Sequence, residues 1–239
     1  MGIGKYIKEI GRGKDGARAL CDAVAKNAGT ERRAAIAAAK EVALAKVSRA
    51  QPQYGLVEAI REAVGEDGLI VDEVTQVAYI AWYGLPVYKP RTMITSGFNG
   101  TLGYGFPTAL GVKVANPDRP VVSICGDGGF LFGGSDLATA MQFGINLVTV
   151  VVNNASYGNV LRDQQRLFDG RHSGSVLTNP DFVAYGRAFG VGTWRVEDAA
   201  GLRGALAEAL ASNAPALIEV VSDITKDYPP SEFHQPKRT

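Results

Sequence analysis

Two short polar segments in this chain each end a continuous apolar run. Gly126-Asp127-Gly128-Gly129 ends the first run, and Asn153-Asn154 ends the second. Apolar runs of this length, separated by a helix-like segment, are typical of parallel strands that are covered on both faces. Ligands of open α/β sheets bind outside the carboxyl ends of the strands. We therefore expect Asp127 and Asn154 to lie side by side and to face one crevice.

These residue types are suited to binding a phosphate group through a divalent cation. Glycines allow backbone N–H groups to approach an anion closely, and helix N-termini favour negative charge. An aspartate in such a place would repel a phosphate unless a cation lay between them. Mg²⁺ takes about six oxygen ligands, commonly one or two carboxylates with phosphate oxygens and water. We expect Asp127 to supply the charge, Asn154 a side-chain oxygen, and a backbone carbonyl near Ser156 a third ligand.

The elements that would position these residues alternate between strands and helices. Expected strands cover residues 69–71, 93–94, 121–125, 148–152, 191–196 and 216–221. Ser135 is the expected N-cap of the helix between the two central strands, and Ser156 that of the helix after them. The alternation predicts an α/β fold, with a doubly wound, mostly parallel sheet of about six strands and helices on both faces.

The composition and the ends of the chain suggest its organisation and exclude several classes of protein. Lys and Arg (25) nearly balance Asp and Glu (24), so neither nucleic acid nor an anionic membrane is an expected partner. With no apolar run of transmembrane length and no signal-peptide core, we expect a soluble, cytoplasmic protein. Residues 1–50, which include expected helices at 17–25 and 30–50, should form a helical linker or the remnant of another domain. One α/β domain with the proposed phosphate site should cover residues 51–222, with an irregular tail at 223–239.

The motif pair resembles the signature of the thiamine diphosphate enzymes. It consists of Gly126-Asp127-Gly128, a spacing of 24 residues (129–152), and Asn153-Asn154. The similarity extends from about Pro52 to about Val221, and is strongest to the diphosphate-binding domain of the acetolactate synthase, pyruvate oxidase and benzoylformate decarboxylase group. The resemblance implies that Asp127 and Asn154 bind Mg²⁺ through their side chains and Ser156 through its backbone carbonyl.

The resemblance also implies which residues contact thiamine diphosphate. These are Thr75, Gln76, Leu102, Gly103, Gly126, Gly128, Gly129, Ser156 and Tyr157. Leu102 matches the large apolar residue that holds the cofactor in a bent, V-shaped conformer. The cofactor takes up the electrons released when a 2-oxo acid is decarboxylated. The implied activity is therefore that of a 2-oxo-acid decarboxylase or carboligase, that is, a lyase or a transferase.

Two features of the family are not matched within the chain. The glutamate that activates thiamine lies on a separate pyrimidine-binding domain, for which residues 1–50 are too short. We expect another domain of a longer protein, or a partner subunit, to supply it within a homo- or hetero-oligomer. Acetolactate synthases also tend to carry a tryptophan shortly after the Asn-Asn pair, where residues 161–166 read LRDQQR. The identity of the 2-oxo acid therefore stays open, as does a role for the loop residue His172.

Two other functions remain as alternatives. A dinucleotide-dependent oxidoreductase would need a G-x-G-x-x-G turn, but counting from Gly126 the third glycine position holds Leu131. A non-catalytic cofactor-binding module is compatible with the sequence, because the residue that would activate the cofactor is expected outside the chain.

Overall fold

The computed structural model describes residues 21–22, 30–221 and 223, and the chain divides into two compact units, Met1–Lys46 and Val47–Thr239. Helix α3 (Thr30–Val47) begins at Thr30, as the sequence predicts, and its described side chains within the first unit are exposed. The helix expected at 17–25 and the tail expected at 223–239 fall almost wholly outside the described residues. None of the helices in the described ranges combines the length and apolarity needed to cross a membrane.

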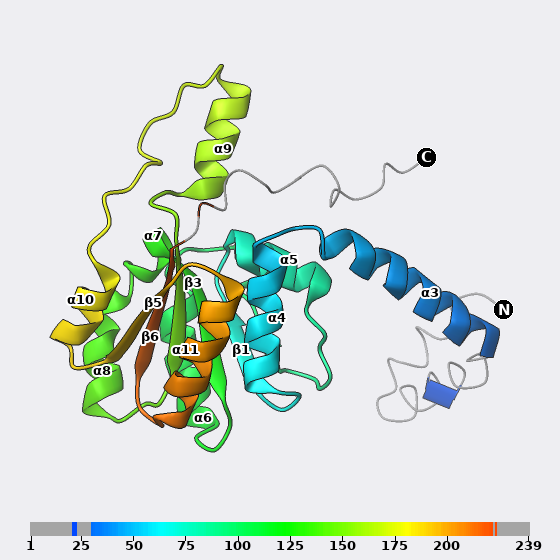
Figure 1. The fold of residues 1–239 in the computed structure, drawn as a ribbon, viewed down its shortest axis with the longest axis horizontal. Helices are drawn as coiled ribbons and strands as arrows, with labels where there is room; N and C mark the ends of the chain where they lie inside the picture. The colour runs from blue at the N-terminus through cyan, green and yellow to red at the C-terminus, as the bar shows by residue number, and fades with distance from the viewer. Residues whose placement is uncertain (1–20, 23–29, 222, 224–239) are drawn as a thin grey trace, which may run out of the picture. The chain divides into compact units, whose positions relative to one another are not determined.

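The second unit is built on a six-stranded sheet (Figure 1). Its strands are β1 (Leu69–Asp72), β2 (Met93–Ile94), β3 (Val121–Gly126), β4 (Val148–Asn153), β5 (Gly192–Val196) and β6 (Ala216–Val221). They lie in the order β2-β1-β3-β4-β6-β5, and every neighbouring pair is parallel. The predicted α/β fold is therefore confirmed, and the sheet, expected to be mostly parallel, is wholly so.

Helices cover both faces of this sheet, as Figure 1 shows. One face packs against α4 (Gln53–Val64), α5 (Gln76–Gly84) and α11 (Ala199–Ala211). The other packs against α6 (Gly105–Ala115), α7 (Asp127–Phe130), α8 (Leu137–Gln142) and α10 (Phe182–Ala188). Side chains alternate between the faces, so Val150 of β4 belongs to the first core and Val151 to the second. Burial on both faces explains why the inner strands β1, β3, β4 and β6 are mainly apolar.

The order of the strands opens a crevice between β1 and β3. From β1 the chain runs to β2 at one edge and then returns to β3 on the other side of β1. The helix that follows β1 covers one face of the sheet, and the helix that follows β3 covers the other. Where connections diverge in this way, the carboxyl ends of the strands border a ligand-binding crevice.

Two predicted helix caps are wrong. Ser135 lies inside a short 3₁₀ helix (Gly134–Asp136), and α8 begins only at Leu137, without a side-chain cap. Helix α9 (Gly158–Leu167) follows Tyr157 rather than Ser156. The backbone N–H of Ser156 instead donates to Asp127 and Asn154, which follow β3 and β4, and α9 begins one position later than a Ser156 cap would place it.

Candidate functional site

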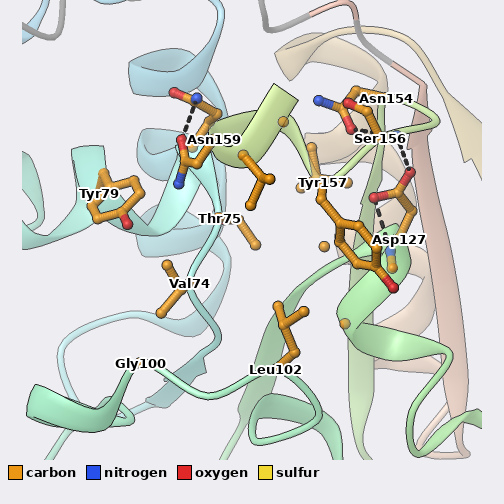
Figure 2. Close-up of a pocket in the computed structure, with 17 residues that line it drawn as sticks. Val74, Thr75, Tyr79, Gly100, Leu102, Asp127, Asn154, Ser156, Tyr157 and Asn159 are labelled. Carbon is orange, nitrogen blue, oxygen red and sulfur yellow. Dashed lines mark hydrogen bonds between the residues drawn. The ribbon is translucent and has the colours of Figure 1, made fainter. Parts of the chain in front are cut away.

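A cavity of about 360 Å³ lies at the carboxyl ends of β1, β3 and β4 (Figure 2). The residues that the sequence predicted for the site and that line this cavity are Thr75, Gln76, Leu102, Gly126, Asp127, Gly128, Gly129, Asn154, Ser156 and Tyr157. Gly103 is not among the lining residues, and its N–H donates to Oε1 of Glu73 at 2.8 Å. A cavity of this size falls in the range that small-molecule cofactors occupy.

The backbone N–H of Ser156 brings together the three residues that are predicted to bind a metal, Asp127, Asn154 and Ser156 itself. Gly126 and Val152 are paired across β3 and β4, so Asp127 and Asn154 follow at neighbouring strand ends. The N–H of Ser156 donates to Oδ2 of Asp127 at 3.2 Å and to Oδ1 of Asn154 at 3.2 Å. Figure 2 shows the three residues together at one end of the cavity. The arrangement gathers a carboxylate and an amide oxygen, which are the ligand types that Mg²⁺ prefers.

Asp127 is a buried carboxylate surrounded by neutral donors. It is 2% exposed, and its Oδ1 accepts from the N–H of Gly128 at 2.9 Å. Its Oδ2 also accepts from Nδ2 of Asn179 at 2.7 Å. Burial raises the pKa of Asp127, and the hydrogen bonds from Asn179, Gly128 and Ser156 oppose that rise. A bound cation would favour the charged form of this carboxylate far more strongly than these neutral donors do.

The glycines after β3 are required because neighbouring side chains fill the space that a Cβ would occupy. A Cβ on Gly128 would lie 2.4 Å from Cε1 of Tyr157. A Cβ on Gly129 would lie 1.7 Å from Oε1 of Glu73. The backbone at both positions therefore forms the wall of the cavity, and the absence of side chains lets a ligand approach it closely.

The start of α5 forms the opposite wall of the cavity. Thr75 is the N-cap, and its side chain accepts from the N–H of Ala78. Gln76 donates from Nε2 to Oδ1 of Asn159 at 2.8 Å. Within the described part of the chain, Oε1 of Gln76 and Oγ of Ser156 are buried without a hydrogen-bond partner. Buried polar atoms of native proteins are usually paired, so these two lining residues offer polar atoms that a ligand or water in the cavity can bind.

Leu102 lines the cavity from a turn that Glu73 holds in place. The Glu73 carboxylate, only 1% exposed, accepts from the N–H of Gly103 and, at 3.2 Å, from that of Gly105. Gly103 has φ +77°, a conformation that favours glycine. Burial raises the pKa of Glu73, and the two backbone N–H groups oppose that rise. Glu73 therefore connects the end of β1, the turn with Leu102, and the glycine segment after β3.

Several residues of the site were not predicted from the sequence. Asn159 and Tyr79 line the cavity, and Glu73 and Asn179 support its walls. Asn179 carried one signal, since it is a polar residue directly before Pro180 and the helix N-cap Asp181. The loop histidine His172 is exposed, lies outside the cavity lining, and contacts the carbonyl of Gly170 through Nδ1.

Comparison with known proteins identifies the domain. Residues 73–220 match the model of the thiamine pyrophosphate enzyme C-terminal TPP-binding domain. Among solved structures, the thiamine diphosphate-dependent 4-hydroxybenzoylformate decarboxylase of Rhodococcus jostii RHA1 superposes with a TM-score of 0.67 at 30% identity. That superposition covers 72% of this chain and 32% of the decarboxylase.

Related sequences include acetolactate synthases. The mitochondrial catalytic subunit from Aspergillus candidus is 42% identical over 134 residues, which cover 56% of this chain and 19% of the relative. The isozyme 1 large subunit from Escherichia coli K12 is 32% identical over 179 residues, which cover 74% of this chain and 32% of the relative. This chain thus corresponds to between a fifth and a third of their length. It belongs to the thiamine pyrophosphate enzyme family, as a C-terminal TPP-binding domain similar to that of the acetolactate synthases.

Proposed function

We propose that this domain binds the diphosphate of thiamine diphosphate through Mg²⁺. The side-chain oxygens of Asp127 and Asn154 and the backbone carbonyl of Ser156 would be the protein ligands of the cation. The observation that carries the proposal is the shared amide of Ser156, which brings a buried carboxylate and an amide oxygen together beside a glycine turn. This donor set suits a hard cation that also binds phosphate oxygens.

The remaining lining residues have complementary roles in this proposal. The diphosphate would lie against the backbone of Gly126, Gly128 and Gly129 on one side, and against Thr75 and Gln76 on the other. Leu102 would support the bent form of the cofactor, while Gly103 would fix the turn that carries Leu102. Tyr157, which contacts Gly128, would cover the diphosphate and exclude water.

We infer that the complete enzyme decarboxylates or ligates 2-oxo acids. Support comes from the relatives, which include acetolactate synthases and a 4-hydroxybenzoylformate decarboxylase. Bound thiamine diphosphate supplies the electron sink for such reactions. No glutamate is among the described residues that line the cavity, so a pyrimidine-binding domain, on the same protein or a partner subunit, would supply the activating group. On this proposal the active site would lie between domains, within an oligomer.

Calorimetric titration of the chain with thiamine diphosphate tests the proposed cofactor site. We expect binding with Mg²⁺, much weaker binding with EDTA, and none to NAD. Asp127→Ala should abolish the Mg²⁺-dependent part and Asn154→Ala should weaken it, because each removes a cation ligand. Asp118→Ala, which removes an exposed carboxylate on the turn before β3, is the matched control. An affinity for the cofactor that does not depend on Mg²⁺ or on Asp127 would refute the proposal.

A further inference from the structure

A continuous line of hydrogen-bonded side chains runs from Asp127 away from the cavity. Nδ2 of Asn179 donates to Oδ2 of Asp127 at 2.7 Å and to Oδ1 of Asn153 at 2.9 Å. Nδ2 of Asn153 in turn donates to Oε1 of Glu219 at 2.7 Å. The line joins the segment before α10 to the ends of β3 and β4 and to Glu219 within β6. These segments are far apart in the sequence.

The side-chain amides of Asn179 and Asn153 each have one allowed orientation. Exchanging the oxygen and nitrogen of either amide by a 180° flip would place its oxygen against another oxygen acceptor. Both N–H bonds of the Asn179 amide point at oxygens, one of Asp127 and one of Asn153. The oxygen of Asn153 also accepts from the N–H of Ala155 at 3.1 Å, while its nitrogen faces the Glu219 carboxylate. Since a carboxylate only accepts and an amide nitrogen only donates, the two carboxylates fix the orientation of both amides.

Arg195 holds the far end of the line and also the segment that carries Asn179. Its Nε donates at 2.7 Å to Oε2 of Glu219, which is only 3% exposed. Its Nη2 donates at 2.6 Å to Oδ1 of Asp181, two residues after Asn179. Asp181 is the N-cap of α10. Arg195 therefore connects two places to the β5–β6 side of the sheet, where Arg195 and Glu219 are paired. These are the Glu219 end of the line and the backbone segment that carries Asn179.

We propose that Asn179 is a positioning residue for the cation site, with Asn153, Glu219 and Arg195 as its support. By holding Oδ2 of Asp127, Asn179 fixes the rotation of the carboxylate about its Cβ–Cγ bond, and so fixes where its oxygens face the cavity. This inference rests on the proposed role of Asp127 as a Mg²⁺ ligand. It also gives the two asparagines of the motif separate tasks, because Asn153 supports Asp127 from behind while Asn154 faces the cation.

The proposal predicts a change in the preference between Mg²⁺ and Ca²⁺. Mg²⁺ needs near-ideal octahedral geometry at about 2.0–2.1 Å, whereas Ca²⁺ accepts irregular and larger shells. A carboxylate that is free to rotate should therefore lose affinity for Mg²⁺ more than for Ca²⁺. Removal of groups that orient a metal ligand typically lowers metal affinity about 10–100-fold.

The test is a titration of Asn179→Ala with each metal ion at a fixed, high concentration of thiamine diphosphate. The readout is the melting temperature of the full chain. We expect the Mg²⁺ concentration at half-effect to rise roughly 10–100-fold, the Ca²⁺ value to rise clearly less, and the metal-free melting temperature to stay near that of wild type. Asn146→Ala is the matched control, because it removes an exposed hydrogen bond from Nδ2 of Asn146 to Oδ1 of Asn213, near the opposite end of β4. It should change neither metal response.

Arg195→Lys is a second variant, which changes the support of the line at Glu219 instead of Asn179 itself. The Arg195 side chain is half-exposed. Lys keeps the charge beside Glu219 but cannot bind both carboxylates in the same fork, so a smaller loss with the same preference is expected. Unchanged Mg²⁺ and Ca²⁺ responses in both variants, or equal losses for the two ions, would overturn the positioning role. If wild type itself shows no Mg²⁺-dependent response that Asp127→Ala removes, the proposed function fails instead.

Discussion

At the scale of single residues, this domain buries carboxylates near its cavity and stabilises each in a different way. Asp127 is surrounded by amide donors, and Glu73 accepts from the backbone of the Leu102 turn. Asp72, fully buried at the end of β1, accepts from Nε1 of Trp82 at 2.5 Å. Burial of a charged group is costly unless it is well paired, so each carboxylate has a measurable effect on stability.

Asp72→Asn should stabilise the protein at neutral pH. Burial raises the pKa of Asp72 to about 6, above the value of about 3.9 for an unfolded chain. The folded state therefore prefers the protonated form, and this stabilisation is present below about pH 4 and lost as the pH rises through about 6. An asparagine stays neutral throughout. Urea denaturation should show the variant gaining up to roughly 2–3 kcal/mol over wild type between pH 4 and pH 7.5.

Asp169→Asn is the control for this pH series, because Asp169 is exposed and its positive φ of 54° is one that asparagine tolerates. Because the exchange is on an exposed side chain, it should change the free energy of unfolding by no more than about 0.5 kcal/mol. A constant difference between Asp72→Asn and wild type from pH 4 to 7.5 would contradict the assigned titration of Asp72.

Gly129→Ala should destabilise the domain even without cofactor. The new methyl group would meet the Glu73 carboxylate, whose displacement breaks its hydrogen bonds to the Leu102 turn. Overpacking of this kind costs about 1–3 kcal/mol, measurable by urea denaturation. Gly204→Ala in α11 is the matched control, because nothing lies within 4 Å of its Cβ position. It should stabilise the domain by up to about 1 kcal/mol, and equal effects of the two changes would contradict this account.

Among the elements, the strands could be predicted from the sequence, and so could the strand ends that carry the site residues. The central strands β3 and β4 are mainly apolar and are followed by Asp127 and Asn154. Their parallel arrangement, and the position of these two residues at the same edge of the sheet, could therefore be predicted from local patterns. The Ser156 cap was wrong because a local cap rule cannot anticipate that Asp127 and Asn154 bind the same backbone. The Ser135 cap was wrong because a short 3₁₀ helix precedes α8. Asn179 and Glu219 were missed because their partners lie 52 and 66 residues away in the chain.

The turn that carries Leu102 should matter to catalysis more than to folding or binding. Leu102 is 38% exposed within the described domain, so Leu102→Ala removes little buried apolar surface and should leave the free energy of unfolding nearly unchanged. In the assembled enzyme, we expect a fall in kcat that is larger than the fall in cofactor affinity, because the proposed role of Leu102 is to hold a reactive conformer.

Leu131→Ala is the matched control for this turn, since Leu131 is 39% exposed and does not line the cavity. It should leave both kcat and cofactor affinity near the wild-type values. Equal losses of kcat in the two variants, or a loss of affinity alone in Leu102→Ala, would contradict the proposed support of the cofactor by Leu102.

At the scale of the whole molecule, the chain corresponds to between 19% and 32% of the relatives' length. The proposed site holds the diphosphate, while the activating glutamate is expected on a pyrimidine-binding domain. We therefore expect the purified chain to release no CO₂ from pyruvate with thiamine diphosphate and Mg²⁺, and release to begin when a matching pyrimidine-binding domain is supplied. Appreciable decarboxylation by the chain alone would contradict this division of tasks.

The central claim is that a cation between Asp127 and Asn154 holds the diphosphate in this cavity. A crystal structure with thiamine diphosphate and Mn²⁺ in place of Mg²⁺ tests it directly, because Mn²⁺ gives an anomalous signal at the metal position. We expect one anomalous peak in contact with the side-chain oxygens of Asp127 and Asn154, with the diphosphate on its other side. A diphosphate bound elsewhere, or bound in this cavity without a metal peak between these residues, would contradict it.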